Sequence, residues 1–562
     1  MWVSKILTPS LQYPNRSRYV RCRAKAQKKR VAVVGNGWAA LGSAHHLSKQ
    51  GFDVILLDSH GGKTTSYDCV EVGIQGRGQL INSPYVIHKS TYSSIESLPT
   101  RKVVLLQDPH VSGTLTVIYF LLLTSLASSL SPTGQDQHNI PQKVWRLKFQ
   151  YFKIYLGCQL HWVHSFTLNS FVSLSRIELH HFLSWLLSLT STTLILPGES
   201  MIQNFSTAVT ARELFKQFGC SERLYRQVFN PILQVGLFAP AEQCSAAAAL
   251  GIIYYFILAH QQDFDVMWCR GTLKEKIFMP WLELMKIKGC ELHQKRRVTD
   301  FSLNEDTGCI SEVVCGEVRY AVDAVVLAVG VSTLQSIVMN SWTIFSFVLQ
   351  ARQDFLNIMN LAAIDVLSVR LRLDRNVNIP KASNACFGYD DSSGWTFFDL
   401  NAIYDEYRDE PVTILEANFY HANQLLPLKD DQIVAKVMSY LSKCIKEFEQ
   451  ASVLEKVVTR LPKSATHFFP GSYNYMMRGS TTFPNLFMAG DWIINRHGSW
   501  SQEKAYVSGL EAANRVIDYL GEGNFAKIIA VEEDEPHFQT LRSFNRSIAE
   551  IRAQLPLADF FL

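Results

Sequence analysis

Three small residues near the start of the chain have the spacing of a dinucleotide-binding turn. Gly35, Gly37 and Ala40 form a G-x-G-x-x-A pattern directly after the apolar, β-branched run 31–34. The first glycine permits a tight turn, the second lets a pyrophosphate approach the backbone, and the small third residue lets a helix pack close to the strand. Asp58 follows at about the distance expected of a carboxylate that binds the adenosine ribose hydroxyls. We therefore expect this part of the chain to bind a dinucleotide.

A strand, a helix and a second strand must hold these residues in place. Residues 31–34 are predicted to form a buried parallel strand, because they are apolar and β-branched. The helix that follows is expected to reach about Lys49 and to end at Gly51, which suits a C-cap. A second strand over 52–57 then ends at Asp58. The pattern is much more specific in this context than it is alone.

The same stretch resembles the FAD-binding N-terminus of the flavin amine oxidase and carotenoid (phytoene) desaturase superfamily. In that family the second strand is soon followed by G-G-R-x-x-[ST], and residues 61–66 of this chain are G-G-K-T-T-S. The resemblance implies that Gly62 and Lys63 bind the cofactor. Lys63 replaces an arginine that contacts the cofactor phosphates, so it keeps the charge but lacks the planar fork, and we expect a weaker contact. Residues 72–76 resemble the next glycine-containing turn of the family, near the flavin.

Two later segments extend the resemblance. Residues 296–330 resemble the second cofactor segment, a hairpin and then a buried strand that ends at Gly330, and the resemblance implies that the backbone of Val298 pairs with adenine. Residues 483–520 resemble the last segment, in which A-G-D is followed by E-G-A and S-G-x-x-A-A. The resemblance implies that Gly490 and Asp491 bind the ribityl or pyrophosphate part of FAD.

The helix expected from Ala505 to Leu520 would direct its first backbone donors at the pyrimidine edge of the flavin, after a loop over 498–504. Lys504 stands where the family has glycine. It either crowds the approach of the cofactor or places a cation beside it, and the sequence leaves both readings open.

The agreement of three separated segments predicts FAD as the cofactor and an α/β fold. This fold has a Rossmann-type FAD-binding domain assembled from discontinuous segments, with an α+β substrate domain that contains a mixed sheet. The expected divisions are a transit peptide at 1–28; FAD-binding segments at 29–78, 296–336 and 461–525; substrate-domain segments at 206–295 and 337–460; a divergent segment at 79–205; and a C-terminal tail at 526–562.

Composition gives no support for a nucleic-acid-binding protein, a disulfide scaffold or a metal-binding protein. The chain has 562 residues, a net charge of +4, 47% hydrophobic and 19% charged residues, which suits an enzyme of two or three domains and gives no argument for nucleic-acid binding. Its eleven cysteines include no C-x-x-C pair, so we expect free thiols in a reducing compartment. His45-His46 and His180-His181 lack the spacing of metal ligands, and no metal site is predicted.

The N-terminal region has the composition of an organellar transit peptide. No acidic residue precedes Asp53 in the chain, and residues 16–24 are strongly basic. We expect a plastid protein, in the stroma or associated with a membrane, with the mitochondrion as the alternative. No sustained apolar segment indicates a secretory signal.

The segment 79–205 differs from the rest of the chain. It lacks clear helical periodicity, capping signals and resemblance to the superfamily, and residues 111–135 carry no charge. A faulty gene model or aberrant splice form would explain it, and a membrane-docking insertion is the alternative. Residues 338–350 show a similar local break.

These observations predict an FAD-dependent oxidoreductase of the amine oxidase/carotenoid desaturase type that acts on an apolar substrate, with isoprenoids as candidates. A flavin-dependent carotenoid-type isomerase without net redox, an amine oxidase and an inactive product remain alternatives. Oxygen and quinone are both open as the electron acceptor, and peripheral membrane contact is expected. Flavin supplies the electron chemistry, so no acid or base is required, and no catalytic residue is assigned. His467, Tyr473, His497 and Trp500 lie around the third segment, and each either lines the flavin face or is a packing residue.

Overall fold

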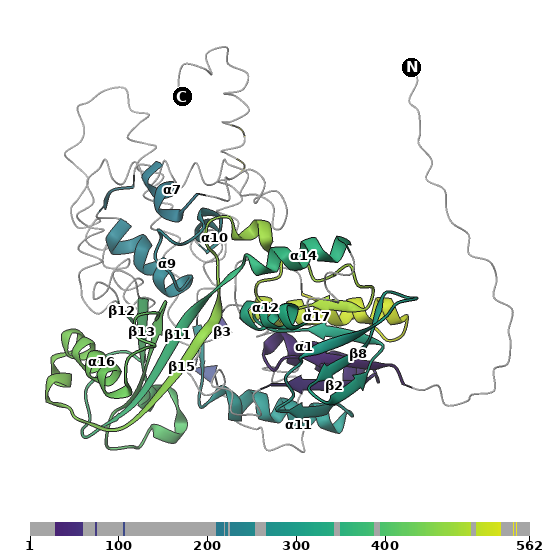
Figure 1. Ribbon diagram of the computed structural model, residues 1–562. Coiled ribbons are helices and arrows are strands. Elements are labelled where there is room, and N and C mark those ends of the chain that lie inside the picture. The colour runs from purple at the N-terminus through teal and green to yellow at the C-terminus, as the bar shows by residue number, and fades with distance from the viewer. Residues whose placement is uncertain are drawn as a thin grey trace, which may run out of the picture.

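A computed structural model describes most of the chain beyond residue 208 and one stretch near the start (Figure 1). The described residues are 28–59, 74–75, 105–106, 209–217, 220–222, 225–252, 266–341, 349–386, 394–495, 502–529, 543 and 547. Residues 1–27 of the expected transit peptide, Gly62, Lys63 and nearly all of the segment 79–205 lie outside them, so the predictions made there stay predictions.

The cofactor segments meet in one parallel sheet of five strands, in the order β16-β10-β1-β2-β6. Every neighbouring pair in this sheet is parallel. Its strands are β1 (Arg30–Val34), β2 (Asp53–Asp58), β6 (Glu291–Gln294), β10 (Ala324–Leu327) and β16 (Leu486–Met488). The predicted assembly of this domain from discontinuous segments is therefore confirmed. One boundary changes, because β6 lies in the range 206–295 that the sequence assigns to the substrate domain.

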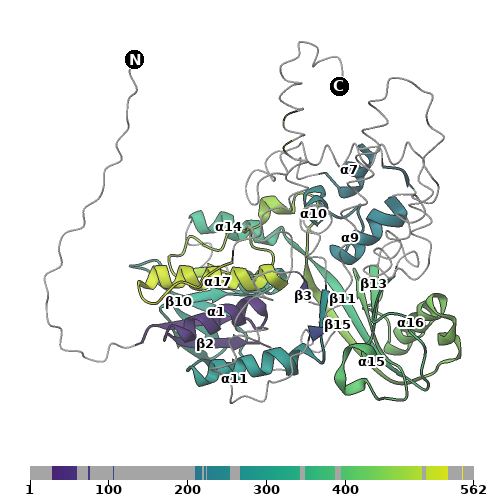
Figure 2. The ribbon, with the colours of Figure 1, turned by 180° about the vertical axis from the view of Figure 1, so that it is seen from behind.

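Helices cover one face of this sheet. They are α1 (Trp38–Lys49), the π-helical turn η6 (Lys274–Phe278), α11 (Met279–Ile287) and α17 (Gln502–Leu520). Val31, Val33 and Val54 point into this layer and share a hydrophobic cluster with Trp281 and Tyr506. Figure 2 shows α1 and α17 beside each other over the strands. Helix α17 begins at Gln502 rather than at Ala505, so Lys504 belongs to the helix and not to a loop.

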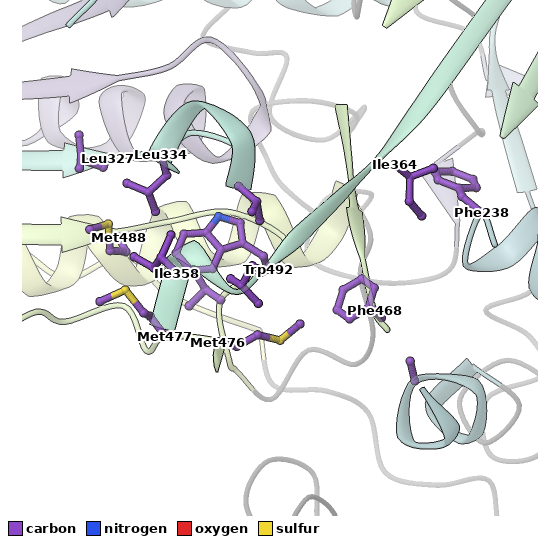
Figure 3. Packing of buried hydrophobic residues seen from close by; sticks show 14 of the residues in the cluster. Phe238, Leu327, Leu334, Ile358, Ile364, Phe468, Met476, Met477, Met488 and Trp492 are labelled. Atoms are coloured by element: carbon purple, nitrogen blue, oxygen red, sulfur yellow. The ribbon is translucent and has the colours of Figure 1, made fainter. Parts of the chain in front are cut away.

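The opposite face packs against a small antiparallel sheet and two helices. The sheet has the order β7-β8-β9, and the layer contains β7 (Asp300–Asn304), β8 (Cys309–Cys315), β9 (Val318–Ala321), α12 (Val331–Asn340) and α14 (Leu349–Met359). A second hydrophobic cluster lies between the parallel sheet and this layer. Alternate residues of the parallel strands, such as Ala32 and Val34, belong to it. Figure 3 shows Trp492 within it, among Leu334, Ile358 and Met476. Residues 342–348 of the expected apolar insertion lie outside the described chain.

A second five-stranded sheet lies largely in the part of the chain that the sequence assigns to the substrate domain. Its order is β12-β13-β14-β11-β15, with β11 (Ala362–Leu373), β12 (Ser383–Cys386), β13 (Gly394–Asp399), β14 (Ile414–Tyr420) and β15 (Val453–His467). All four pairings are antiparallel, so the prediction of a mixed sheet is wrong. The apolar spacing over residues 430–448 predicts an amphipathic helix with Ile433, Val437, Leu441 and Ile445 on one face. Helix α16 (Asp430–Cys444) forms there and covers one face of the sheet with the first three of these residues. It ends before Ile445, which the sequence places on the same helical face.

Short helices complete the described chain. They are α7 (Ala211–Gln217), η3 (Tyr225–Phe229), α9 (Asn230–Gly236), α10 (Ala246–Ile252), α15 (Leu400–Ile403), η7 (Asp405–Tyr407), η8 (Lys446–Gln450) and η9 (Ser472–Tyr475). The small strand β5 (Val266–Cys269) pairs with β3 (Ile74–Gln75) and β4 (Leu105–Leu106). Within the described residues, no helix combines the length and the apolar character needed to cross a membrane.

Candidate cofactor site

The predicted cofactor residues gather at the carboxyl ends of the parallel strands. Gly35 and Gly37 follow β1, Asp58 ends β2, and Gly490 and Asp491 follow β16. Strand β1 is followed in sequence by β2 on one side, whereas β10 and β16 lie on its other side. The order of the strands therefore reverses between β1 and β10. Dinucleotides bind at this kind of switch point, outside the carboxyl ends of the strands.

The turn after β1 has the backbone that its glycines predict. Gly35 has φ of +128°, and a Cβ atom there would lie 2.2 Å from the carbonyl oxygen of Ala328 and 3.4 Å from the Cβ of Ala40. Ala40 itself is completely buried, which fits its predicted role in close packing of helix on strand. A Cβ atom on Gly37 would meet nothing within 4 Å. The first glycine therefore serves the fold, and the second faces open space.

The N-terminus of α1 begins beside this space. Its N-cap is Gly37, no side chain caps the first turn, and the first turn carries no acidic residue. The unpaired N–H groups of a helix start attract anions, and the helix dipole adds to this attraction. This part of the structure therefore fits a pyrophosphate.

Asp58 lies on the β2 side of the turn. It is 5% exposed, and the side-chain amide of Asn36 donates to Asp58 Oδ1 at 3.0 Å. The backbone N–H of Arg296 donates to the carbonyl oxygen of Asp58 at 2.8 Å, which brings the chain around Val298 next to the acid. Val298 is buried, and the described residues supply no hydrogen-bond partner to its backbone. This arrangement fits the ribose and adenine of a dinucleotide.

Gly490 and Asp491 lie on the β16 side. Gly490 has φ of +148°, and its N–H donates to Ser508 Oγ at 2.8 Å. Thr466 Oγ1 lies 3.2 Å from both carboxylate oxygens of Asp491. Burial raises the pKa of Asp491, while Lys504 and Thr466 act in the opposite direction. The structure thus places a carboxylate deep at this end of the sheet, with a cation near it.

That cation is Lys504, whose side chain is only 3% exposed. Burial lowers the pKa of Lys504 to about 8, and attraction to Asp491 and Glu511 limits the shift. Ala505 follows it in the first turn of α17 and is half-buried. The described side chains thus place the cation of Lys504 near Asp491.

Of the four side chains proposed for the flavin face, two are described by the structure, and both pack against neighbouring residues. His467 Nε2 donates a hydrogen bond to the carbonyl oxygen of Gln243 at 3.1 Å, and burial lowers the pKa of His467. Tyr473 packs against Phe468, and burial raises its pKa. His497 and Trp500 lie outside the described residues.

The adjacent histidines of α1 are packing residues. His45 and His46 are both buried, and the indole N–H of Trp281 donates to His45 Nδ1. The described cysteines are free thiols, and among the described residues no group of His, Cys, Asp and Glu could hold a metal ion.

Sequence reasoning missed three polar partners in the site. Asn36 lies between the two glycines of the motif, and this position could have indicated its contact with Asp58. Ser508 is part of the S-G-x-x-A-A segment, but its bond to Gly490 depends on how α17 docks. Thr466 carries no sequence signal, because β15 belongs to the other sheet.

These observations define a class of protein. It is an α/β protein whose Rossmann-type parallel sheet has the geometry of a dinucleotide-binding site at the carboxyl ends of its strands. Residues 167–517 match the family model for flavin containing amine oxidoreductase, which is more than half of the chain. The chain belongs to this family and is a flavin-dependent oxidoreductase. The match begins within the segment 79–205, so residues 167–205 do resemble the family, and the expectation that this whole segment lacks such resemblance is wrong.

Individual relatives agree with this family. The chain is 22% identical over 517 residues to a protein of Synechococcus elongatus described as "Probable zeta-carotene desaturase", covering 87% of this chain and 98% of the relative. It is 21% identical over 331 residues to the chloroplastic/chromoplastic 15-cis-phytoene desaturase of Capsicum annuum, covering 58% of this chain and 55% of that protein.

Solved structures agree in fold. An oxidoreductase from Methanosarcina mazei has a TM-score of 0.54 at 12% identity, with 86% of this chain and 99% of that chain covered. Cyclohexylamine oxidase from Brevibacterium oxydans has a TM-score of 0.50 at 11% identity, with 88% of this chain and 100% of that chain covered. At these identities the likeness concerns the fold alone.

Proposed function

We propose that the protein is an FAD-dependent oxidoreductase that removes two hydrogens from an apolar substrate of the isoprenoid class in plastids. The observation that carries the cofactor assignment is the convergence of Gly37, Asp58, Val298 and Asp491 on one edge of the parallel sheet. Bound there, FAD would accept both electrons and one proton from the substrate, and a second proton would leave to solvent.

The residues of the site divide the work of holding this cofactor. The start of α1 at Gly37 would bind the pyrophosphate, and Asp58 and Val298 would bind the adenosine. Asp491 would bind the polar arm of the flavin half, with Gly490 and the start of α17 beside it. The contribution of Gly62 and Lys63 rests on the sequence resemblance.

The substrate class is supported by the carotenoid desaturase relatives, of which one aligns with nearly its whole length. The plastid location is supported by the basic N-terminal region and by the chloroplastic description of the phytoene desaturase relative. An apolar substrate of this kind resides in membranes, so we include peripheral membrane contact in the proposal. Quinone or oxygen would take the electrons.

The first test is the visible spectrum of the purified protein. We expect a yellow protein that releases FAD on denaturation, identified by chromatography against FMN and FAD standards. A colourless protein that binds NADP in a titration would refute the cofactor assignment.

The second test distinguishes the alternative reactions. An oxidoreductase converts a carotene precursor only when an electron acceptor is present, and reduces its flavin anaerobically with substrate. An isomerase acts anaerobically with pre-reduced flavin and needs no acceptor. Turnover of primary or secondary amines without turnover of carotenes would instead establish an amine oxidase.

A further inference from the structure

Lys504 occupies a position that the docking of α17 fixes. It lies in the first turn of the helix, four residues before Ser508 and hence on the same helical face. Ser508 Oγ accepts the N–H of Gly490 at 2.8 Å and donates to the carbonyl oxygen of Ala505 at 2.7 Å. The face of α17 that carries Lys504 is therefore turned toward the end of β16, where Asp491 follows Gly490.

The location is unfavourable for a lysine unless negative charge balances it. A helix N-terminus is the positive end of the helix dipole, and a buried ammonium group loses its hydration. Lys504 is 3% exposed and nevertheless lies within the fields of two carboxylates, Asp491 and Glu511. Glu511 also lies 3.9 Å from the guanidinium group of Arg515. Lys504 is thus an energetically unfavourable buried cation at the edge of the sheet where the predicted cofactor-binding residues lie.

The order of the strands places this cation relative to the two halves of a dinucleotide. The pyrophosphate position at α1 lies at the switch point between β1 and β10. Asp58 ends β2 on one side of this point, and Asp491 follows β16 on the other side. If the adenosine lies over β2, the other half of the cofactor extends over β10 and β16, where Lys504 and Asp491 lie.

We propose that Lys504 is the cation that compensates the negative charge gained by the flavin half of the cofactor on reduction, and that Asp491 positions it. This inference rests on the FAD-binding function proposed above. Two electrons and one proton taken from the substrate leave the flavin one unit more negative, and a fixed cation in a buried site stabilises that charge. Lys504 is thereby a charge-compensating residue and exchanges no proton in the reaction.

The test compares wild-type protein with Lys504→Met and Lys504→Arg variants of the full chain. Lys286→Met is the matched control, because Lys286 is exposed on α11 and its substitution removes the same charge. FAD affinity is measured by titration of apoprotein, and the midpoint potential of the bound flavin by spectroelectrochemistry. We expect similar FAD affinity in all four proteins. We also expect a more negative potential in Lys504→Met, restored toward wild type in Lys504→Arg and unchanged in Lys286→Met.

Sulfite gives an independent readout of positive charge at the flavin. We expect the dissociation constant of sulfite to rise about tenfold in Lys504→Met and to stay unchanged in the control. If Lys504→Met fails to fold by circular dichroism, Lys504→Gln provides a polar replacement for the same measurements.

Three outcomes decide between explanations. Wild-type protein that does not bind FAD would refute the proposed function itself. Bound FAD with the same potential and sulfite affinity in Lys504→Met and wild type would refute the role of Lys504 only. Tighter FAD binding in Lys504→Met would show that Lys504 obstructs the cofactor, which also overturns the inference.

Discussion

Helices α17 and α1 cross with their backbones in contact at Gly509 and Ala39. A Cβ atom on Gly509 would lie 2.2 Å from the carbonyl oxygen of Ala39. This contact explains why the S-G-x-x-A-A segment has small residues: Ala512 and Ala513 are also completely buried in the same layer. The close crossing holds the start of α17 at the cofactor edge of the sheet.

We therefore expect Gly509→Ala to destabilise the protein by roughly 2 kcal/mol, because the added methyl group forces the two helices apart. Urea denaturation followed by circular dichroism measures the change. Gly330→Ala is the control, because a Cβ atom on Gly330 meets nothing within 4 Å and its φ of −69° suits any residue. Equal stability of the two variants would contradict the proposed packing.

The two glycines of the first turn should respond differently to substitution. Gly37→Val is expected to keep the fold and to lose FAD, because its Cβ projects into open space that the pyrophosphate would occupy. Gly35→Ala is expected to lose folded protein, because of the φ of +128° and the contact with Ala328. Thermal unfolding and flavin content of each variant separate the two effects. Full flavin occupancy in Gly37→Val would show that the site is misplaced.

Asp491→Ala should weaken FAD binding by at least about tenfold, since it removes a charged hydrogen-bond acceptor from the polar arm of the cofactor. Titration of the apoprotein with FAD measures this loss. Asp518→Ala, at an exposed position near the end of α17, is the control and should bind FAD as the wild type does. An unchanged affinity of Asp491→Ala would remove Asp491 from the site.

The stability of the apoprotein should depend on pH through Lys504. Its pKa is lowered from the ordinary value of 10.5 to about 8. Between these values the unfolded chain keeps a proton that the folded chain has released, so the free energy of unfolding rises with pH in this range. The contribution of one proton approaches about 1.4 kcal/mol per pH unit.

Urea denaturation of apoprotein at several pH values from 7 to 10.5 measures this dependence. The difference in unfolding free energy between wild type and Lys504→Met should grow in favour of the wild type as the pH rises through that window. The corresponding difference for Lys286→Met should stay level. A level difference for Lys504→Met would show that Lys504 has an ordinary pKa.

Sequence alone determined the local elements and the identity of most candidate site residues. The strand–helix–strand unit from Arg30 to Asp58 follows from short-range signals: an apolar run, glycines at fixed spacing and the helix-terminating Gly51, which has φ of +91°. The periodicity of α16 likewise predicted its buried face. Such signals lie within a few residues of each other, so they can be read without knowledge of the fold.

Only the tertiary structure decided which distant elements share a sheet and where charged side chains point. Strand β6 has no fully buried residue, and nothing in its own sequence shows that it pairs with β2. The antiparallel pairing of β11 to β15, which brings Thr466 to Asp491, depends on hydrogen bonds between strands far apart in the chain. The sequence places Lys504 in a loop before the helix, but the docking of α17 through Ser508 and Gly509 buries it in the first turn of that helix, near Asp491. Burial and long-range pairing arise from packing of the whole chain, and this is why local sequence signals could not predict them.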